Sequence, residues 1–158
     1  MIFVTVGSQK FQFNRLLVEI DKLVEEKIII EEVFAQIGYS DYKPKNYKYK
    51  EFLDRDEFAN IMEKCDKLIT HGGTGAIIGA VKRDKKVIAV PRLSKYGEHV
   101  DDHQLQIVKQ FDHMGLISSI SDINELKKII LSIEKIRYKK YVSNTNEILS
   151  EIECYINK

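Results

Sequence analysis

The 158-residue sequence has little of what marks secreted or membrane-spanning chains. Its two cysteines, Cys65 and Cys154, lie far apart and form no metal-type or redox-type pair. Such sparse cysteine is typical of a reducing compartment. The only apolar run at the N-terminus, residues 1–6, is too short for a signal peptide, and no stretch approaches the length of a membrane span. We therefore expect a cytoplasmic chain with inert thiols and no direct membrane span.

The sequence also lacks an excess of either charge. Lys and Arg number 25 and Asp and Glu number 24, which gives a formal net charge of +1. The composition therefore provides no overall attraction to nucleic acid or anionic lipid, and a charged ligand must be bound locally. Residues 42–50, YKPKNYKYK, mix tyrosines with lysines as RNA-binding surfaces do. We interpret this stretch as a solvated connecting loop, because the rest of the chain offers no basic face, and we expect no nucleic-acid partner.

Short apolar runs alternate along the chain with segments of helical periodicity. Apolar residues recur at helical spacing from Phe13 to Val24, and Asp54 with Glu57 resembles a capping box that opens a helix. Near-continuous apolar strands that alternate with helices are typical of a parallel sheet covered on both faces. We predict a single Rossmann-like α/β domain over residues 1–158. The expected strands are residues 2–6, 33–37, 67–70, 87–90 and 116–120.

Further helices are expected in the second half of the chain. A helix through residues 105–111 ends at Gly115, and Asp122 with Glu125 opens the next. Residues 139–158 have the pattern of an amphipathic helix, which either packs on the domain or docks a partner. Its apolar positions are Tyr141, Ile148, Leu149, Ile152, Tyr155 and Ile156.

The stretch ITHGGTGAIIGA, residues 69–80, joins a strand to a helix through a glycine-rich turn. Ligands of parallel α/β sheets bind at the carboxyl ends of the strands. Glycines let the backbone approach a ligand, and the free N–H groups and dipole at the start of the following helix favour an anion. The turn therefore predicts a diphosphate site, although a tight structural connection is the alternative reading of a lone glycine cluster.

Two other strand ends have similar features. The N-terminal strand runs through Gly7 and Ser8 into a helix, so that Ser8 offers a hydroxyl and a backbone N–H to the same phosphates. Another strand ends at Pro91, and the amide of Gln104 in the following segment can donate to and accept from sugar hydroxyls. Three strand ends are thus expected to converge on one site.

Several polar residues in these segments have a structural alternative. His71 can bind backbone at its strand end instead of a phosphate. His99 and His103 have the spacing of half a zinc site, but no third ligand is indicated, so no metal is expected. Three acidic residues can be loop or N-cap residues with solvated carboxylates: Glu98, Asp101 and Asp102.

The motifs THGGTGAIIGA, KVIAVPR and DDHQ, in this order, resemble the C-terminal domain of glycosyltransferase family 28, whose members are GT-B enzymes that use nucleotide-diphosphate sugars. The resemblance extends from VTVGS to Gly115. The phrase PRLSKYGEHVDDHQLQI is similar to a narrower group, the small bacterial capsular or exopolysaccharide glycosyltransferase subunits that work with a membrane-anchored partner. A eukaryotic relative of this group is the sugar-nucleotide-binding subunit of the dolichol-linked N-acetylglucosaminyltransferase.

The resemblance implies a role for individual residues. The diphosphate would be bound by Gly7, Ser8, His71, Gly72, Gly73, Thr74 and Gly75. The nucleobase would face Phe52 and Leu53, and the sugar would contact Arg92, Glu98, His103 and Gln104. The sequence departs from the family pattern at Ala76 and Gly79, where relatives commonly carry a serine and a ribose-binding glutamate.

The resemblance also implies a function. The chain would be the UDP-sugar-binding subunit of a two-component enzyme that transfers a hexose, of the galactose or N-acetylglucosamine type, to a lipid-linked acceptor in capsular or exopolysaccharide biosynthesis. No cofactor or obligatory metal is expected, because a helix N-terminus can stabilise the departing diphosphate. The catalytic residues are unknown. A membrane-anchored partner would supply the general base and the acceptor site, and would recruit the chain to the inner face of the membrane. The alternative is a non-catalytic enhancer that has lost nucleotide affinity, as Ala76 and Gly79 would permit.

Overall fold

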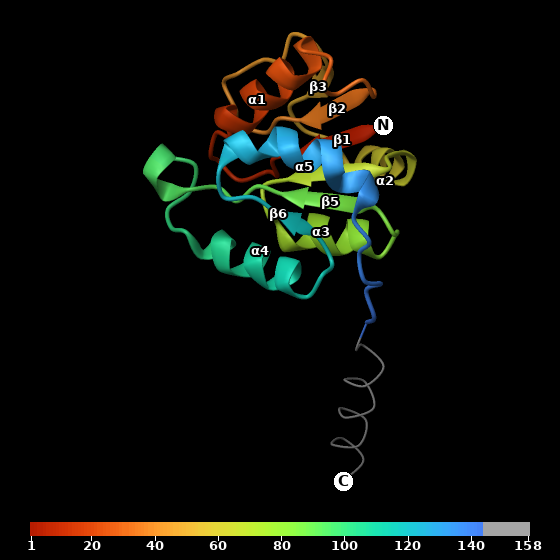
Figure 1. Cartoon of the computed structure of the whole chain (residues 1–158). Coiled ribbons are helices and arrows are strands. Elements are labelled where there is room, and N and C mark those ends of the chain that lie inside the picture. The colour runs from red at the N-terminus through yellow and green to blue at the C-terminus, as the bar shows by residue number, and fades with distance from the viewer. Residues whose placement is uncertain (144–158) are drawn as a thin grey trace.

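A computed structural model describes residues 1–143 and contains one six-stranded parallel sheet with helices on both faces (Figure 1). The strand order is β3-β2-β1-β4-β5-β6. The predicted Rossmann-like α/β fold is confirmed. The strands are β1 (Ile2–Thr5), β2 (Val33–Gln36), β3 (Lys48–Lys50), β4 (Lys67–Thr70), β5 (Lys86–Ala89) and β6 (Ser118–Ser119). The α-helices are α1 (Asn14–Glu25), α2 (Arg55–Lys64), α3 (Thr74–Val81), α4 (His103–His113) and α5 (Leu126–Ser132). Short 3₁₀ turns are η1 (Ser94–Tyr96), η2 (Ile123–Glu125) and η3 (Ile133–Lys135).

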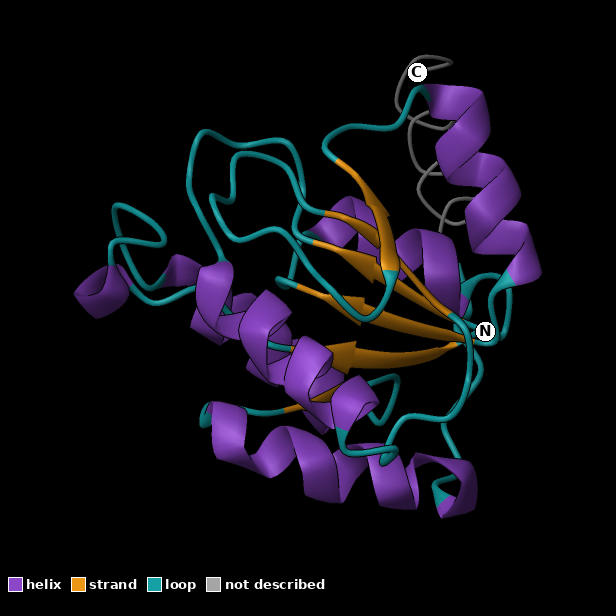
Figure 2. Ribbon diagram, turned by 90° about the horizontal axis from the view of Figure 1, so that it is seen from above, coloured by secondary structure: helices purple, strands orange, loops and turns teal. Residues whose placement is uncertain are grey.

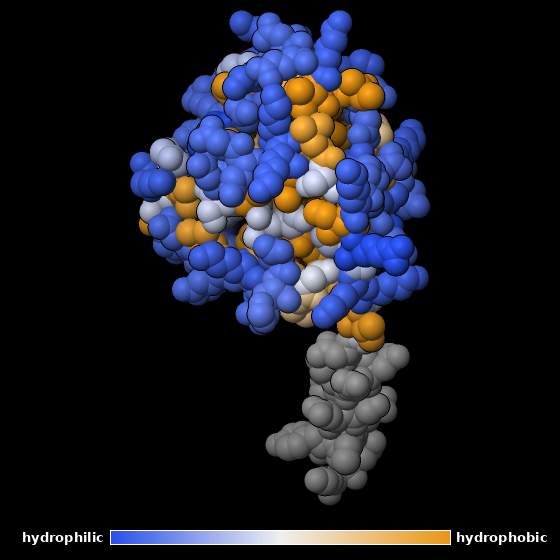
Figure 3. Space-filling model, in the orientation of Figure 1, coloured by the Kyte–Doolittle hydropathy of each residue, from blue (hydrophilic) through white to orange (hydrophobic). Residues whose placement is uncertain are grey.

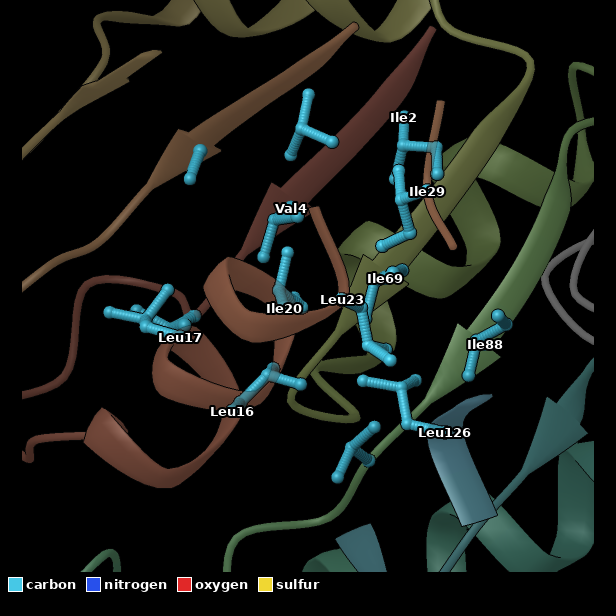
Figure 4. Close-up of a cluster of buried hydrophobic side chains, with 14 of the residues drawn as sticks. Ile2, Val4, Leu16, Leu17, Ile20, Leu23, Ile29, Ile69, Ile88 and Leu126 are labelled. Carbon is cyan, nitrogen blue, oxygen red and sulfur yellow. The ribbon is translucent and has the colours of Figure 1, made fainter. Parts of the chain in front are cut away.

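Alternate side chains of the strands divide the core into two layers. On β1, Val4 belongs to the cluster formed with α1 and α5, whereas Phe3 belongs to the cluster formed with α2, α3 and α4. Figure 4 shows the first layer, in which Leu16, Ile20 and Leu23 of α1 face the strands. The inner strands β1, β4 and β5 of this sheet are buried on both sides, which explains their near-continuous apolar runs in the sequence.

The outer surface contrasts with these layers. The face drawn in Figure 3 is mostly hydrophilic, and its apolar side chains show in small groups. Within residues 1–143, no helix is long and apolar enough to cross a membrane.

Local signals determine where the helices begin. Asp54 accepts a hydrogen bond from the N–H of Glu57, and the Glu57 carboxylate accepts one from the N–H of Asp54, so the predicted capping box opens α2. Asp122 accepts from the N–H of Asn124, but it opens the short turn η2, and α5 follows from Leu126.

The strand order places a crevice between β1 and β4. From β1 the chain proceeds outward to β2 and β3, and it then returns to β4 on the other side of β1. The connections from β1 and β4 therefore leave in opposite directions, and ligands bind at such a switch point. The loops after the strands lie beyond the carboxyl ends of the strands, and the N-terminus lies at the opposite ends (Figure 2).

The interpretation of residues 42–50 as a solvated loop is correct only in part: residues 42–47 form a loop in which Lys43, Lys45 and Asn46 are exposed. Residues 48–50 form the edge strand β3, and Tyr42 and Tyr47 pack against the α1 side of the core. The Tyr42 hydroxyl donates to Asp21 at 2.6 Å, and that of Tyr47 donates to the carbonyl of Leu17 at 3.1 Å. Tyr42 and Tyr47 thus attach the β2–β3 connection to α1 and are not free to stack on bases, whereas Tyr49 on β3 is 36% exposed.

The C-terminal segment differs from the expected helix where it is described. Residues 139–143 form no helix. The remaining predicted positions, from Ile148 to Ile156, lie outside the described residues. The last expected strand, residues 116–120, is reduced to Ser118–Ser119.

Candidate functional site

A cavity of about 440 Å³ opens at the carboxyl ends of β1, β2 and β4. Thr5, Gln36 and the residues after Thr70 contribute one wall, and the first turns of α2 and α3 contribute the others. The fold thus brings together segments that are far apart in sequence. Six residues predicted from the sequence line this cavity: Gly7, Ser8, Leu53, His71, Gly73 and Gly75.

The imidazole of His71 occupies the space between the two glycine turns. A Cβ atom at Gly7 would lie 2.7 Å from Cε1 and 2.8 Å from Nε2 of this ring. A Cβ atom at Gly73 would lie 2.7 Å from Nε2. Gly7 also has a φ of +77°, which other residues rarely adopt. Both glycines are therefore needed so that the two turns can close on the same ring.

His71 is neutral at physiological pH. Its Nδ1 lies 3.3 Å from the carbonyl oxygen of Thr5, which can only accept, so the single proton resides on Nδ1. Burial, reinforced by the nearby Arg92 guanidinium, lowers the pKa of His71 to about 4. His71 therefore binds backbone at the strand end, as the structural alternative predicts. Its Nε2 faces Gly7 and Gly73.

The N-terminus of α3 presents unpaired backbone donors. Gly73 is the N-cap residue and provides no side-chain cap, and the first helical bond runs from the N–H of Ile77 to the carbonyl of Gly73. The preceding N–H groups therefore have no partner within the helix. Thr74 and Gly75 are exposed at this end. Such an end, with the helix dipole, suits an anion.

A second cavity, of about 310 Å³, adjoins the first and shares Gln9, His71 and Gly73 with it. It is also lined by His99 and Asp101, which come from the loop between β5 and α4. Predicted residues that line it as well are Gly72, Thr74, His103 and Gln104. The third strand end thus meets the other two beside His71.

Arg92 and Glu98 are placed differently from the sugar-contacting role expected for them. Both are fully buried, with 0% of their surface exposed, and neither lines a cavity described above. The Glu98 carboxylate is bound by Arg15 of α1 at 2.9 Å and accepts from the N–H of Leu93 at 2.9 Å. Arg92 and Glu98 thus stabilise the loop after β5 through buried contacts. The exposed His103 and the half-buried Gln104 remain available to a ligand.

The family model for the glycosyltransferase family 28 C-terminal domain matches residues 1–156, almost the whole chain. The chain belongs to this family. Its site thus lies on a family 28 domain whose glycine turns, neutral histidine and helix terminus surround the first cavity.

Two fungal proteins are similar in sequence to this family 28 domain over most of its length. The UDP-N-acetylglucosamine transferase subunit ALG13 of Candida albicans is 25% identical over 158 residues, which cover 96% of the chain and 51% of that protein. The subunit of the same name from Cryptococcus neoformans is 25% identical over 101 residues, 61% of the chain and 48% of that protein. The chain therefore spans about half the length of these relatives.

Solved structures show the same fold. An NMR solution structure of ALG13 superposes with a TM-score of 0.62 at 18% identity, and the match covers 96% of this chain and 93% of that one. The glycotransferase of kitacinnamycin superposes with a TM-score of 0.61 at 15% identity, over 84% of this chain and 34% of that one. The family 28 domain thus corresponds to about one third of that enzyme.

Only two of the four remaining family positions line the first cavity. Leu53 and Ala76 line it, whereas Phe52 is 43% exposed and packs edge-on against Tyr39, with ring centroids 5.1 Å apart. Gly79 lines neither cavity, and a Cβ built there meets only the guanidinium of Arg83 at 4.0 Å.

Sequence reasoning missed five polar residues that line the first cavity: Thr5, Gln9, Gln36, Asp54 and Arg55. Gln36 ends β2 and donates to the carbonyl of Gly7 at 3.3 Å, Gln9 lines both cavities, and Asp54 lines the first. The position of Gln36 at the carboxyl end of a predicted strand was an available signal. Among residues 1–143, no three His, Cys, Asp or Glu side chains are grouped to hold a metal ion.

Proposed function

We propose that this chain is the UDP-sugar-binding subunit of a two-component glycosyltransferase. The observation that carries the proposal is the meeting of the Gly7–Ser8 turn with the open N-terminus of α3 around one cavity at the switch point of the sheet. Membership of glycosyltransferase family 28 and the names of the similar ALG13 subunits support a sugar nucleotide, with UDP-N-acetylglucosamine as the first donor to test.

The donor would be bound through its diphosphate. The free N–H groups of the first turn of α3 and the hydroxyl of Ser8 would donate to phosphate oxygens, and the base would lie beside Leu53. The sugar would extend past His71 toward His103 and Gln104 in the second cavity. Charge that develops on the departing UDP would be stabilised by donors that are already oriented, so the leaving group would need no metal.

The acceptor half of the reaction would come from another chain. GT-B chemistry usually requires a general base for the acceptor hydroxyl. The carboxylates beside the second cavity include Asp101, which is exposed, whereas Glu98 is committed to Arg15. A membrane-anchored partner would supply the base and a lipid-linked acceptor site, and would bring this chain to the inner face of the membrane in capsular or exopolysaccharide synthesis.

A transfer assay tests the two-component proposal. The purified chain, its candidate partner and their mixture are each supplied with a labelled UDP-hexose and a lipid-linked acceptor. We expect product from the mixture only. Robust transfer by this chain alone would contradict the requirement for a partner.

Nucleotide binding distinguishes the catalytic subunit from a non-catalytic enhancer. Thr74→Glu would place a carboxylate where the diphosphate is expected and should abolish UDP binding measured by calorimetry. Ser121→Glu, an exposed change in the turn before α5, serves as the control and should leave it unchanged. The parent chain could instead be folded and support transfer by its partner but bind no UDP. That result would favour the alternative that the chain is a non-catalytic enhancer.

A further inference from the structure

Arg92 is a buried cation without a carboxylate partner. Its guanidinium donates to the carbonyl of Val6 at 2.5 Å and to that of Glu98 at 3.3 Å, and 0% of the residue is exposed. Among residues 1–143 it forms no ion pair, and its Nε is the one buried side-chain polar atom left without a hydrogen-bond partner. Burial lowers the pKa of Arg92 to about 10, so the side chain still carries its charge at neutral pH.

The nearest acidic group is already engaged. The two carboxylate oxygens of Glu98 are bound by Nε and Nη2 of Arg15, each at 2.9 Å, and Oε2 also accepts from the N–H of Leu93. Glu98 attracts Arg92 only from a distance. The three side chains together therefore carry a net charge of +1. Buried charges in proteins are normally paired, because removing an ion from water is costly.

This unmatched charge lies directly behind the candidate diphosphate site. Val6, whose carbonyl binds Arg92, precedes the turn of Gly7 and Ser8. The guanidinium is also close enough to His71 to help lower its pKa. The backbone N–H of Arg92 lies 3.4 Å from the Gln104 side chain, at the edge of the second cavity. Arg92 thus contacts or influences residues from each of the three strand ends that form the site.

We propose that Arg92 is a positioning residue that serves as the buried counter-charge of the donor diphosphate, an inference that rests on the proposed UDP-sugar site. The charge acts across the Val6–Gly7 backbone through protein of low polarity, where electrostatic attraction is screened less than in water. Arg92 lines neither cavity and therefore does not touch the donor. Its bond to Val6 fixes the first phosphate turn, and its charge supplies attraction that the neutral His71 cannot give.

Two substitutions, one that removes the positive charge of Arg92 and one that removes the negative charge of Glu98, distinguish this role from a purely structural one. Arg92→Met removes the cation, Arg92→Lys retains it, and Glu98→Gln removes the anion while keeping a similar shape. Both Arg92→Met and Glu98→Gln disturb the buried cluster, so both should lower the melting temperature. Arg137→Met removes one exposed arginine charge away from the site and serves as the control. For each chain, the affinities for UDP, UMP and uridine are measured by NMR titration.

We expect Arg92→Met to weaken UDP binding by about tenfold or more, UMP less, and uridine by less than about twofold. Arg92→Lys should lie between the parent and Arg92→Met. Glu98→Gln should tighten UDP binding, although it destabilises the fold. Arg137→Met should match the parent.

Two results would overturn the proposal. One is equal weakening of UDP and uridine in Arg92→Met, and the other is weakening of UDP in Glu98→Gln. Should Arg92→Met be too unstable to titrate, Glu98→Gln decides alone by the direction of its change. A parent chain that binds no UDP would instead overturn the proposed function, and with it the role of Arg92.

Discussion

Gly72 lies directly against Val108 of α4: a Cβ atom built on Gly72 would fall 2.5 Å from Cγ2 of the valine. The backbone of Gly72 also has a φ of +94°, in the region that favours glycine. The glycine turn after β4 is therefore packed onto the helix that carries His103 and Gln104.

Gly72→Ala should lower the free energy of unfolding by about 2 kcal/mol or more, because it combines a clash with an unfavourable φ. UDP binding should weaken as the turn shifts. The double variant Gly72→Ala, Val108→Ala removes the clash but not the backbone strain. Gly72→Ala should therefore lower the free energy of unfolding less in a chain that already carries Val108→Ala than in the parent chain. Urea denaturation measures both differences. Equal costs in both backgrounds would show that the contact with Val108 is unimportant.

Gly75→Ala should have the opposite effect on stability. A Cβ atom at Gly75 meets nothing within 4 Å, and the residue lies in the first turn of α3. Alanine favours a helix over glycine by up to about 1 kcal/mol, so the variant should unfold at slightly higher urea concentration. UDP should nevertheless bind more weakly, because the methyl group stands where the backbone is expected to approach the diphosphate. Unchanged affinity in the stable variant would move the diphosphate away from this turn.

Gly79→Glu should improve nucleotide binding. The position has room for a side chain, because a Cβ built there meets only the guanidinium of Arg83, at 4.0 Å. Helical side chains point toward the N-terminus, so the glutamate would extend over Gly75 and Ala76, which line the first cavity. A hydrogen bond to a charged acceptor contributes about 1.5–3 kcal/mol, so UDP affinity should rise about tenfold or more.

The comparison of UDP with 2′-deoxy-UDP provides the control for Gly79→Glu. The gain should be lost with the deoxy nucleotide, because one ribose hydroxyl is missing. A stable variant that binds both nucleotides no better than the parent would place the ribose elsewhere.

Glu134 should contribute to stability in a pH-dependent way. Its carboxylate is bound by Lys67 and Lys86, each at 2.6 Å, and these lysines lower its pKa from 4.5 to about 2. Because the pKa is lower in the folded state, the contribution is complete above about pH 4.5 and is lost as the pH falls toward 2. Glu134 is 62% exposed, so the effect should not exceed about 1 kcal/mol.

Glu134→Gln should remove this dependence. Its free energy of unfolding should fall less between pH 4.5 and 2 than that of the parent, in acid denaturation followed by circular dichroism. Parallel stability curves for the two chains would contradict the assignment.

The sequence predicted most of the sheet because buried parallel strands require continuous apolar runs. The strand Lys67–Thr70 and the capping box of Asp54 with Glu57 were both located correctly, since each depends on neighbouring residues. The strand Lys48–Lys50 was missed because it lies at the sheet edge and all of its residues are exposed. These residues form a strand because they pair with β2. The neighbouring sequence gives no signal of that pairing.

The site was only partly predictable for the same reason. Glycine turns are visible in sequence because the conformation and close approach they need exclude other residues, as at Gly7. The burial of Arg92 depends on residues far away in sequence, because its guanidinium donates to the carbonyl of Val6 and lies against the ring of Phe13. A charged residue in a polar loop after a strand has the local sequence of a ligand contact, and only the tertiary structure shows that it points inward.

The proposed function requires that a nucleoside diphosphate binds between the Gly7–Ser8 turn and the N-terminus of α3. The most direct measurement follows backbone amide chemical shifts while UDP is added to the chain. We expect saturable chemical-shift changes concentrated at residues 7–9 and 72–76, with smaller changes at His103 and Gln104. Saturable shifts confined to another part of the molecule, such as the cavity beside Lys85 and Lys139, or no shifts at millimolar UDP, would contradict it.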